Sequence, residues 1–172
     1  MSNILKIISS APLSAKFGML VVLIYSIVAI FAPFIAPYGE REILGRSFEL
    51  WSEKYPLGTD NLGRDMLSRM IFGARNTIGL ALSITILAFL LGSLTGMIAA
   101  ALGGWVDQIL SRIVDVLMSI PSLIFALLIL SIFGTSVPYL IATITVIDAT
   151  RVFRIARATA MNVVVMDYVE VA

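Results

Sequence analysis

The residue types that most often carry chemistry are missing from this chain, because its 172 residues include no histidine and no cysteine. Without the commonest general base and the commonest metal ligands, a metalloenzyme or a serine–histidine hydrolase is disfavoured. The remaining candidates for chemistry are charged side chains, and several of them lie in the run from Pro56 to Arg75, PLGTDNLGRDMLSRMIFGAR. Asp65 and Arg69 stand four residues apart in that run, so they can pair on one helix face. Such a pair predicts a structural role rather than catalysis.

The run from Pro56 to Arg75 divides into a turn and a helix. Its first half is rich in turn formers, each with a local reason to leave regular structure. They are Pro56, Gly58, Thr59, Asp60, Asn61 and Gly63. From Arg64 the apolar residues recur at steps of three and four, which is typical of an amphipathic helix. The residues alone therefore predict a helix on a membrane surface, with the turn and Asp60 fixing its start.

Composition places much of the chain in lipid. The chain is 59% hydrophobic and 13% charged, with a mean hydropathy of +1.01, whereas soluble domains carry roughly 25% charged residues. The net charge of +1 indicates no strongly anionic partner, and nothing points to nucleic acid. We therefore expect an all-α integral membrane protein, a polytopic helical bundle.

Apolar stretches that could cross a hydrocarbon core of roughly 30 Å set the expected organisation. Spans are expected at residues 17–37, 77–102, 116–133 and 137–150, the last of them short. Residues 1–16 would form a cytoplasmic lead, 38–76 a periplasmic loop with the amphipathic helix, 103–115 a cytoplasmic loop of a short turn and a polar helix start, and 134–136 a periplasmic turn. Residues 151–172 would begin as a cytoplasmic amphipathic helix, with Arg151, Arg154 and Arg157 on its basic face. Pro121 frees a backbone carbonyl near the start of the third span, so we expect a kink there.

Two sets of residues within the spans are candidates for function. Gly92, Gly96 and Ala100 recur at four-residue spacing, which lets helix backbones approach closely. That spacing predicts a packing seam, either in a transporter core or in any polytopic protein. Asp148 is expected inside or at the edge of the membrane, where a carboxylate is a functional candidate. Arg151 follows three residues later, so a structural ion pair at the interface is an equally good interpretation.

The basic residues do not decide the orientation in the membrane. The two sides of the membrane would carry equal numbers of basic residues. On the side of the two termini these are Lys6, Lys16, Arg112, Arg151, Arg154 and Arg157. In the loop on the other side they are Arg41, Arg46, Lys54, Arg64, Arg69 and Arg75. The first set sits close to span ends, and Arg151 to Arg157 has few acidic neighbours. We therefore expect a cytoplasmic N-terminus.

The run from Pro56 to Arg75 resembles the hallmark of the inner-membrane permease subunits of the dipeptide, oligopeptide and nickel importers of the ABC class. It is most similar to the second permease of the pair, the C-type subunit. The matching positions are Leu57, Gly58, Thr59, Asp60, Gly63, Arg64, Asp65, Ser68, Arg69, Gly73, Ala74 and Arg75. The resemblance implies the type I importer permease fold.

The end of the chain resembles the start of the family's second motif, the cytoplasmic EAA loop. Tyr168, Glu170 and Ala172 fit its pattern, whereas Val171 departs from the usual alanine. In the family this loop forms a coupling helix that docks into the ATP-binding subunit, so the resemblance gives these residues that role. The chain stops in mid-pattern, as a C-terminally truncated member would, and further spans are expected beyond it in a typical member.

The resemblance implies a permease and not an enzyme. No phosphate-binding loop of the G-x-x-x-x-G-K-[ST] kind occurs, and ATP would be bound by partner subunits, so the chain itself needs no cofactor. The implied partners are a second permease subunit, two ATP-binding subunits and a periplasmic substrate-binding protein, in a bacterial inner membrane, with peptide or a related small solute as cargo. Two alternatives stay open: an inactive remnant or membrane scaffold, and an ion-coupled secondary transporter using Asp148 or Asp115.

Overall fold

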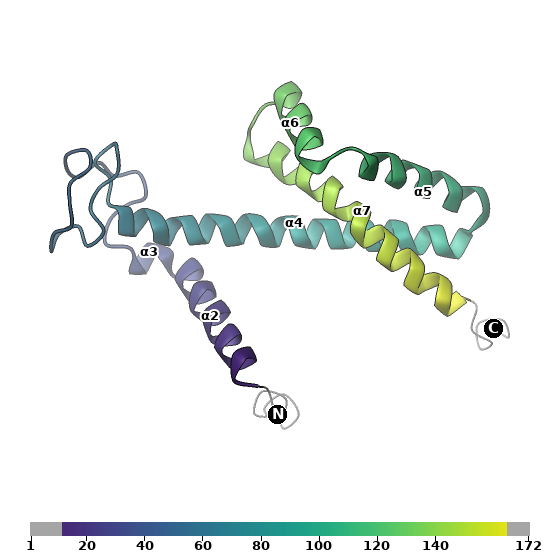
Figure 1. The fold of residues 1–172 in the computed structure, drawn as a ribbon, viewed down its shortest axis with the longest axis horizontal. Coiled ribbons are helices and arrows are strands. Elements are labelled where there is room, and N and C mark those ends of the chain that lie inside the picture. Colours follow the sequence, from purple (N-terminus) through teal and green to yellow (C-terminus); the bar gives the residue numbers. More distant parts are fainter. Residues whose placement is uncertain (1–11, 165–172) are drawn as a thin grey trace. The chain divides into compact units, whose positions relative to one another are not determined.

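The computed structural model describes residues 12–164, and regular structure in that range is helical (Figure 1). The helices are α2 (Leu13–Ile30), α3 (Ala32–Ile35), α4 (Met66–Leu102), α5 (Gly104–Ser119), α6 (Ser122–Phe133) and α7 (Val137–Val164). Within that range strand pairing is limited to one isolated bridge between Thr59 and Asp65. The expectation of an all-α fold is confirmed. The chain divides into two compact units, Met1–Gly79 and Leu80–Ala172.

Within residues 12–164, two helices are long and apolar enough to cross a membrane by themselves, α2 and α4. The pair α5 and α6 would make a third span if it crosses as one, bent by 92° at the break between the two helices. Among the described residues α7 does not join this group, since Asp148, Arg151 and Arg154 interrupt its apolar half. The expected short span at residues 137–150 is thus part of a longer helix that runs on to Val164, and its place in the membrane stays a prediction.

In the first unit the expected span at residues 17–37 is two helices rather than one. α2 already begins at Leu13, and it ends at Ile30. The short α3 follows after Phe31 and holds Pro33 in its first turn. Proline has no backbone N–H to donate to the carbonyl four residues earlier, so the helix is interrupted at this point. Residues 36–65 then form an irregular loop.

The amphipathic helix and the second expected span are one helix. α4 runs for 37 residues without a break, so a separate surface helix before residue 77 is not formed. No proline occurs between Met66 and Leu102, and single glycines such as Gly73 and Gly79 do not stop a helix that is otherwise well supported. The charged residues Arg69 and Arg75 therefore belong to the first turns of the long apolar helix.

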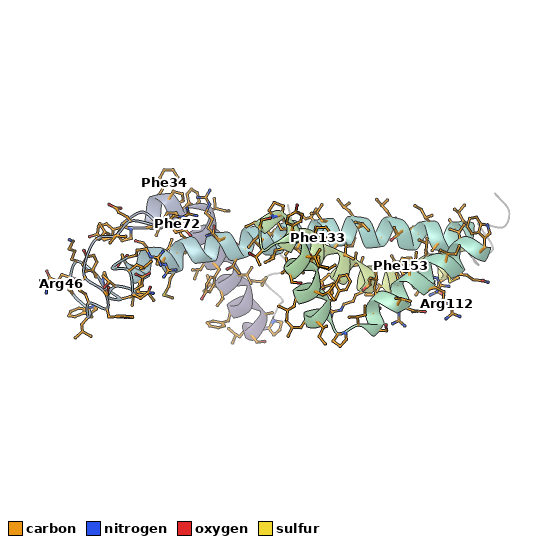
Figure 2. All side chains as sticks on the ribbon, turned by 90° about the horizontal axis from the view of Figure 1, so that it is seen from above. Phe34, Arg46, Phe72, Arg112, Phe133 and Phe153 are labelled. Carbon is orange, nitrogen blue, oxygen red and sulfur yellow. The ribbon has the colours of Figure 1, made fainter. Side chains whose placement is uncertain are left out.

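In the second unit the polar helix start expected within residues 103–115 is present, and the helix extends beyond that range. α5 begins at Gly104 and continues to Ser119, and α6 starts after Pro121. Ile120, which precedes the proline, has extended backbone angles of φ −88° and ψ 128°, because proline disfavours the helical conformation at the residue before it. The kink expected at Pro121 is confirmed as a full break. Ala99, Val114 and Phe153 form a buried cluster in this unit, with Leu110 packed against it. Phe153 is labelled in Figure 2.

Candidate functional site

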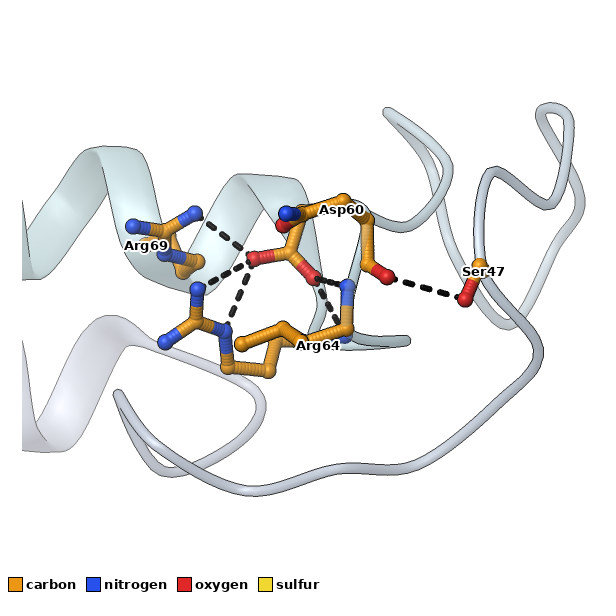
Figure 3. A network of polar contacts seen from close by, with 6 residues as sticks. Ser47, Asp60, Arg64 and Arg69 are labelled. Atoms are coloured by element: carbon orange, nitrogen blue, oxygen red, sulfur yellow. Dashed lines mark hydrogen bonds and ion pairs between the residues drawn. The ribbon is translucent and has the colours of Figure 1, made fainter.

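Asp60 is the centre of a polar network in the first unit (Figure 3). Its Oδ1 accepts hydrogen bonds from the backbone N–H groups of Leu62 (2.8 Å) and Arg64 (3.0 Å). Its Oδ2 accepts from the Arg64 Nε at 2.8 Å and from the Arg69 Nη1 at 2.7 Å. Only 6% of the Asp60 side chain is exposed, so both arginines neutralise a carboxylate that is largely withdrawn from solvent.

The residues beside Asp60 hold the loop in place. The Thr59 hydroxyl donates to the Arg46 carbonyl at 2.6 Å and accepts from the Glu49 N–H at 2.8 Å. The Gly63 carbonyl accepts from the N–H groups of Leu44 and Gly45 at 2.9 and 3.1 Å. These contacts join the turn to a segment that lies ten or more residues earlier. The turn is therefore the part of the loop that the other loop segments contact through hydrogen bonds.

The start of α4 is capped by Asp65 and not, as the sequence suggested, by Asp60. The Asp65 Oδ2 accepts the Ser68 N–H at 2.8 Å, which is the bond of an N-cap residue to the third helical position. The Ser68 hydroxyl, fully buried, accepts the Tyr38 N–H at 3.1 Å. The expected pair between Asp65 and Arg69 is wrong, because Asp65 is used as the cap and Arg69 turns to Asp60. Gly73 and Arg75 lie farther along α4, outside this network.

Burial and hydrogen bonding act in opposite directions on the pKa of Asp60. Burial by itself raises it, but the Arg64 N–H, the Arg64 guanidinium and the Leu62 N–H favour the ionised form and together outweigh burial. The pKa of Asp60 therefore lies well below its ordinary value of 3.8. The ionised carboxylate stabilises the folded loop above the pH at which an unfolded aspartate ionises, and this contribution is lost progressively as the pH falls below about 4.

We expect Asp60→Asn to lower the melting temperature of the detergent-solubilised protein by several degrees at pH 7, because two arginines lose their anion. Between pH 4 and pH 2 the wild-type protein should lose stability more steeply than the variant, so the two unfolding curves approach each other. Thermal unfolding followed across this pH range measures the effect. Glu53→Gln, which removes an exposed carboxylate of the same loop, is the control and should leave the melting temperature at pH 7 almost unchanged. A constant gap between wild type and Asp60→Asn at every pH would contradict the assignment.

In the second unit, glycines of α4 lie directly against α7. A Cβ built on Gly92 would meet the Ala149 carbonyl oxygen and the Val152 Cβ, each at 2.6 Å. One built on Gly96 would meet the Phe153 carbonyl oxygen at 2.7 Å. Ala100 continues the same stripe and is 8% exposed. The structure thus brings this predicted set together as the face of α4 on which α7 packs.

An ion pair between α5 and α7 was not found by sequence reasoning. The guanidinium of Arg157 donates to both carboxylate oxygens of Asp107, and the bond from Nη2 to Oδ2 measures 2.5 Å. The two residues are fifty positions apart. Sequence reasoning placed Arg157 only on a basic face of a helix, and no spacing rule links it to Asp107.

The break between α5 and α6 opens a small cavity of about 160 Å³. Pro121, Ser122, Thr150 and Arg151 contribute to its lining. Arg151 pairs with Asp148 on the same helix at 3.4 Å, and the two side chains are 67% and 41% exposed. The structure therefore brings the predicted pair together, as a contact within one helix. Neither residue is a buried, isolated charge.

Other predicted sites are less informative. Tyr168, Glu170 and Ala172 lie outside the described residues, so their expected role in coupling stays a prediction. Among residues 12–164 no group of three or more carboxylate side chains is placed to hold a metal ion.

A wider apolar groove of about 680 Å³ runs between α4 and α7, from Phe89 and Val152 to Ala101 and Ala160.

Comparison with known proteins shows which class of membrane protein the chain belongs to. The family described as "Binding-protein-dependent transport system inner membrane component" matches residues 88–172, which include the α4–α7 seam. The family described as "N-terminal TM domain of oligopeptide transport permease C" matches residues 14–46. The chain thus belongs to the multi-pass permease components of binding-protein-dependent transport systems in the inner membrane.

Within that class the chain is similar to C-type permeases whose names refer to peptide transport, which confirms the resemblance. The chain is 34% identical to the dipeptide transport system permease protein DppC of Haemophilus influenzae, over 90% of this chain and 55% of that protein. It is 34% identical to the di/tripeptide permease DppC of Pseudomonas aeruginosa, over 88% and 52%. It is 31% identical to the probable D,D-dipeptide permease DdpC of Escherichia coli, over 96% and 55%. The chain spans about half the length of these relatives.

Proposed function

We propose that the chain is a permease subunit of a binding-protein-dependent ABC importer, and that it forms part of the path by which peptides cross the inner membrane. The observation that carries this proposal is the match to peptide permeases over nearly the whole chain, 90% of it for the relative from Haemophilus influenzae. The chain itself would not be an enzyme and would bind no cofactor. ATP would be bound and hydrolysed by partner subunits.

The proposed assembly contains a second permease subunit, two ATP-binding subunits and a periplasmic binding protein. The N-terminus would be cytoplasmic, which places the Asp60 network on the periplasmic side and residues 168–172 on the cytoplasmic side. Tyr168, Glu170 and Ala172 would then contact an ATP-binding subunit. ATP can bias the permease between its inward-open and outward-open states only by a difference in affinity for the two.

The arrangement of the described residues fits a structural role for the periplasmic motif. The Asp60 carboxylate binds two arginines, and Asp65, which is 2% exposed, caps α4 through Oδ2, so neither carboxylate is accessible to a peptide. We infer that the motif is an architectural cap on α4, and that substrate choice is set elsewhere. Substitutions at Asp60 or Asp65 should accordingly reduce the amount of assembled complex more than they change the preference among peptides.

Co-expression with a second permease and the ATP-binding subunits tests the proposal. A tagged chain, extended to the length of its relatives, should retain both kinds of partner in detergent and should import a labelled dipeptide into vesicles only with ATP and the binding protein. Failure to retain either partner would contradict the proposal. Uptake that survives ATP depletion but collapses with an uncoupler would indicate a secondary transporter, and assembly of the complex without any uptake would indicate a scaffold.

A further inference from the structure

The ion pair between Arg157 and Asp107 joins two helices at a point where both are already constrained. Asp107 stands in the first turn of α5 and is 13% exposed, whereas Arg157 is 30% exposed on α7. The contact is two-pronged, from Nε to one carboxylate oxygen and from Nη2 to the other. The Ser111 hydroxyl lies 3.3 Å from the Asp107 Oδ1 and supports it from the next turn of α5. Such paired bonds fix orientation as well as distance.

The same part of α7 is also pressed against α4. A Cβ on Gly96 would approach the backbone nitrogen of Arg157 to 3.0 Å. One turn earlier, Phe153 is buried in the core with Ala99 of α4 and Val114 of α5. Packing thus holds α7 against both neighbours at residue 153, and the ion pair holds it against α5 one turn closer to the C-terminal end. Residues 153–157 can move only if α5 moves with them or the pair breaks.

The other arginines of α7 do not make such a link. Arg151 pairs with Asp148 on its own helix, so that contact connects no two elements. Arg154 is exposed, and its Nη1 lies 3.7 Å from the sulfur of Met118 on α5. This is a weak contact with a neutral side chain. Of the three arginines at this spacing, Arg157 is the one whose described contact ties α7 to another helix through opposite charges.

We propose that Asp107 and Arg157 are a positioning pair that makes α5 follow the C-terminal half of α7. The inference rests on the proposed function, in which a partner subunit acts on the residues beyond α7. A displacement of α7 reaches α5 through the pair and continues to the break at Ile120 and Pro121, where α5 ends. The pair thereby transmits motion to the place where the two half-helices meet, without touching substrate or ATP.

The test uses the complete complex in lipid vesicles and measures two quantities for each variant. The first is peptide imported per ATP hydrolysed. The second is the rate of amide hydrogen exchange in the first two turns of α5. In Asp107→Asn and Arg157→Gln we expect imported peptide per ATP to fall about tenfold, within the range of coupling between linked sites. Exchange in α5 should rise severalfold, while the amount of assembled complex and its ATP hydrolysis stay close to wild type.

Two further variants separate positioning from a general loss of stability. Arg157→Lys keeps the charge but cannot form the two-pronged contact, so it should restore only part of the ratio. Because the chain has no cysteine, Asp107→Cys combined with Arg157→Cys can be joined by a bifunctional thiol reagent. Import per ATP should be low before the cross-link and should recover after it. Arg112→Gln removes a positive charge from an α5 side chain that points away from the helices, and it is the matched control (Figure 2).

The outcomes distinguish the inference from the function on which it rests. If the wild-type complex imports nothing with ATP, the proposed function fails, and the pair is then judged by hydrogen exchange alone. Unchanged exchange in α5 on breaking the pair overturns the inference in either case. Import and ATP hydrolysis that fall in parallel with the amount of complex also overturn it, because they would show that the pair serves folding only.

Discussion

Replacing Gly92 by alanine will weaken the packing of α4 on α7, and Gly96→Ala will do the same. The added methyl group would stand 2.6 Å from the Ala149 carbonyl oxygen in the first case and 2.7 Å from the Phe153 carbonyl oxygen in the second. These neighbours are backbone atoms that cannot rotate away, so the helices must separate. Overpacking of this kind costs about 1–3 kcal/mol. The loss appears as a lower melting temperature of the detergent-solubilised protein.

A control in the same helix isolates the effect of close approach. A Cβ on Gly79 would meet no atom within 4 Å. Alanine there should be neutral or should stabilise the helix by about 0.5–1 kcal/mol, because glycine is the poorer helix former. Equal losses of stability for Gly79→Ala and Gly92→Ala would show that the seam is not the cause. Gly92→Val should prevent α7 from packing on α4, which limited proteolysis between α6 and α7 would detect.

Replacing Gly63 by alanine will unfold much of the loop around Asp60. Gly63 has a φ of +77°, in the left-handed region that costs other residues about 1–2 kcal/mol. In addition, a Cβ there would stand 2.1 Å from the Gly45 carbonyl oxygen. That carbonyl belongs to the segment that the turn holds in place. Relieving the clash would therefore move the segment around Gly45 away from the turn. We expect faster proteolysis of residues 36–65 and a loss of stability larger than the backbone strain alone.

Gly103→Ala measures the backbone strain without the collision. Gly103 also has a positive φ, +58°, but a Cβ on it would have open space around it. Alanine at this position should therefore cost about 1–3 kcal/mol and no more. Gly103 lies in a different, glycine-only region of backbone space, with φ 58° and ψ −155°, where strain is no smaller. A larger loss for Gly63→Ala than for Gly103→Ala is therefore attributed to the close contact between Gly63 and Gly45. A Gly63→Ala protein that is as stable as Gly103→Ala would contradict the described packing of the loop.

Features that depend on local periodicity could be predicted from the sequence. The four-residue spacing of Gly92, Gly96 and Ala100 is a property of one helix, and the structure places that face on α7. The break at Pro121 follows from the chemistry of a single residue. The polar helix start in residues 103–115 was predicted, but its continuation to Ser119 was not, because the apolar residues from 116 onward were assigned to the next span.

Features that depend on tertiary contacts could not be predicted. Asp65 and Arg69 have the spacing of a helix pair, but Asp65 is the residue before the first turn, and its carboxylate is needed there. Arg69 is then nearer to Asp60, which the turn folds back toward α4. The pair of Asp107 and Arg157 joins residues fifty positions apart, and no local rule connects them. Both errors come from treating charges as neighbours only along the chain.

The charges on α7 also bear on how the protein is made. Asp148, Arg151, Arg154 and Arg157 lie on this helix, and a charged residue at the middle of a span costs about 2.5–3.5 kcal/mol on insertion. α7 is therefore a poor candidate for entering the bilayer by itself during synthesis. The seam of α4 and the carboxylate of Asp107 both precede it in the chain, so they leave the ribosome first. We therefore expect α7 to insert against these earlier segments, and a defect in the seam should appear as failed insertion and degradation of the newly made chain.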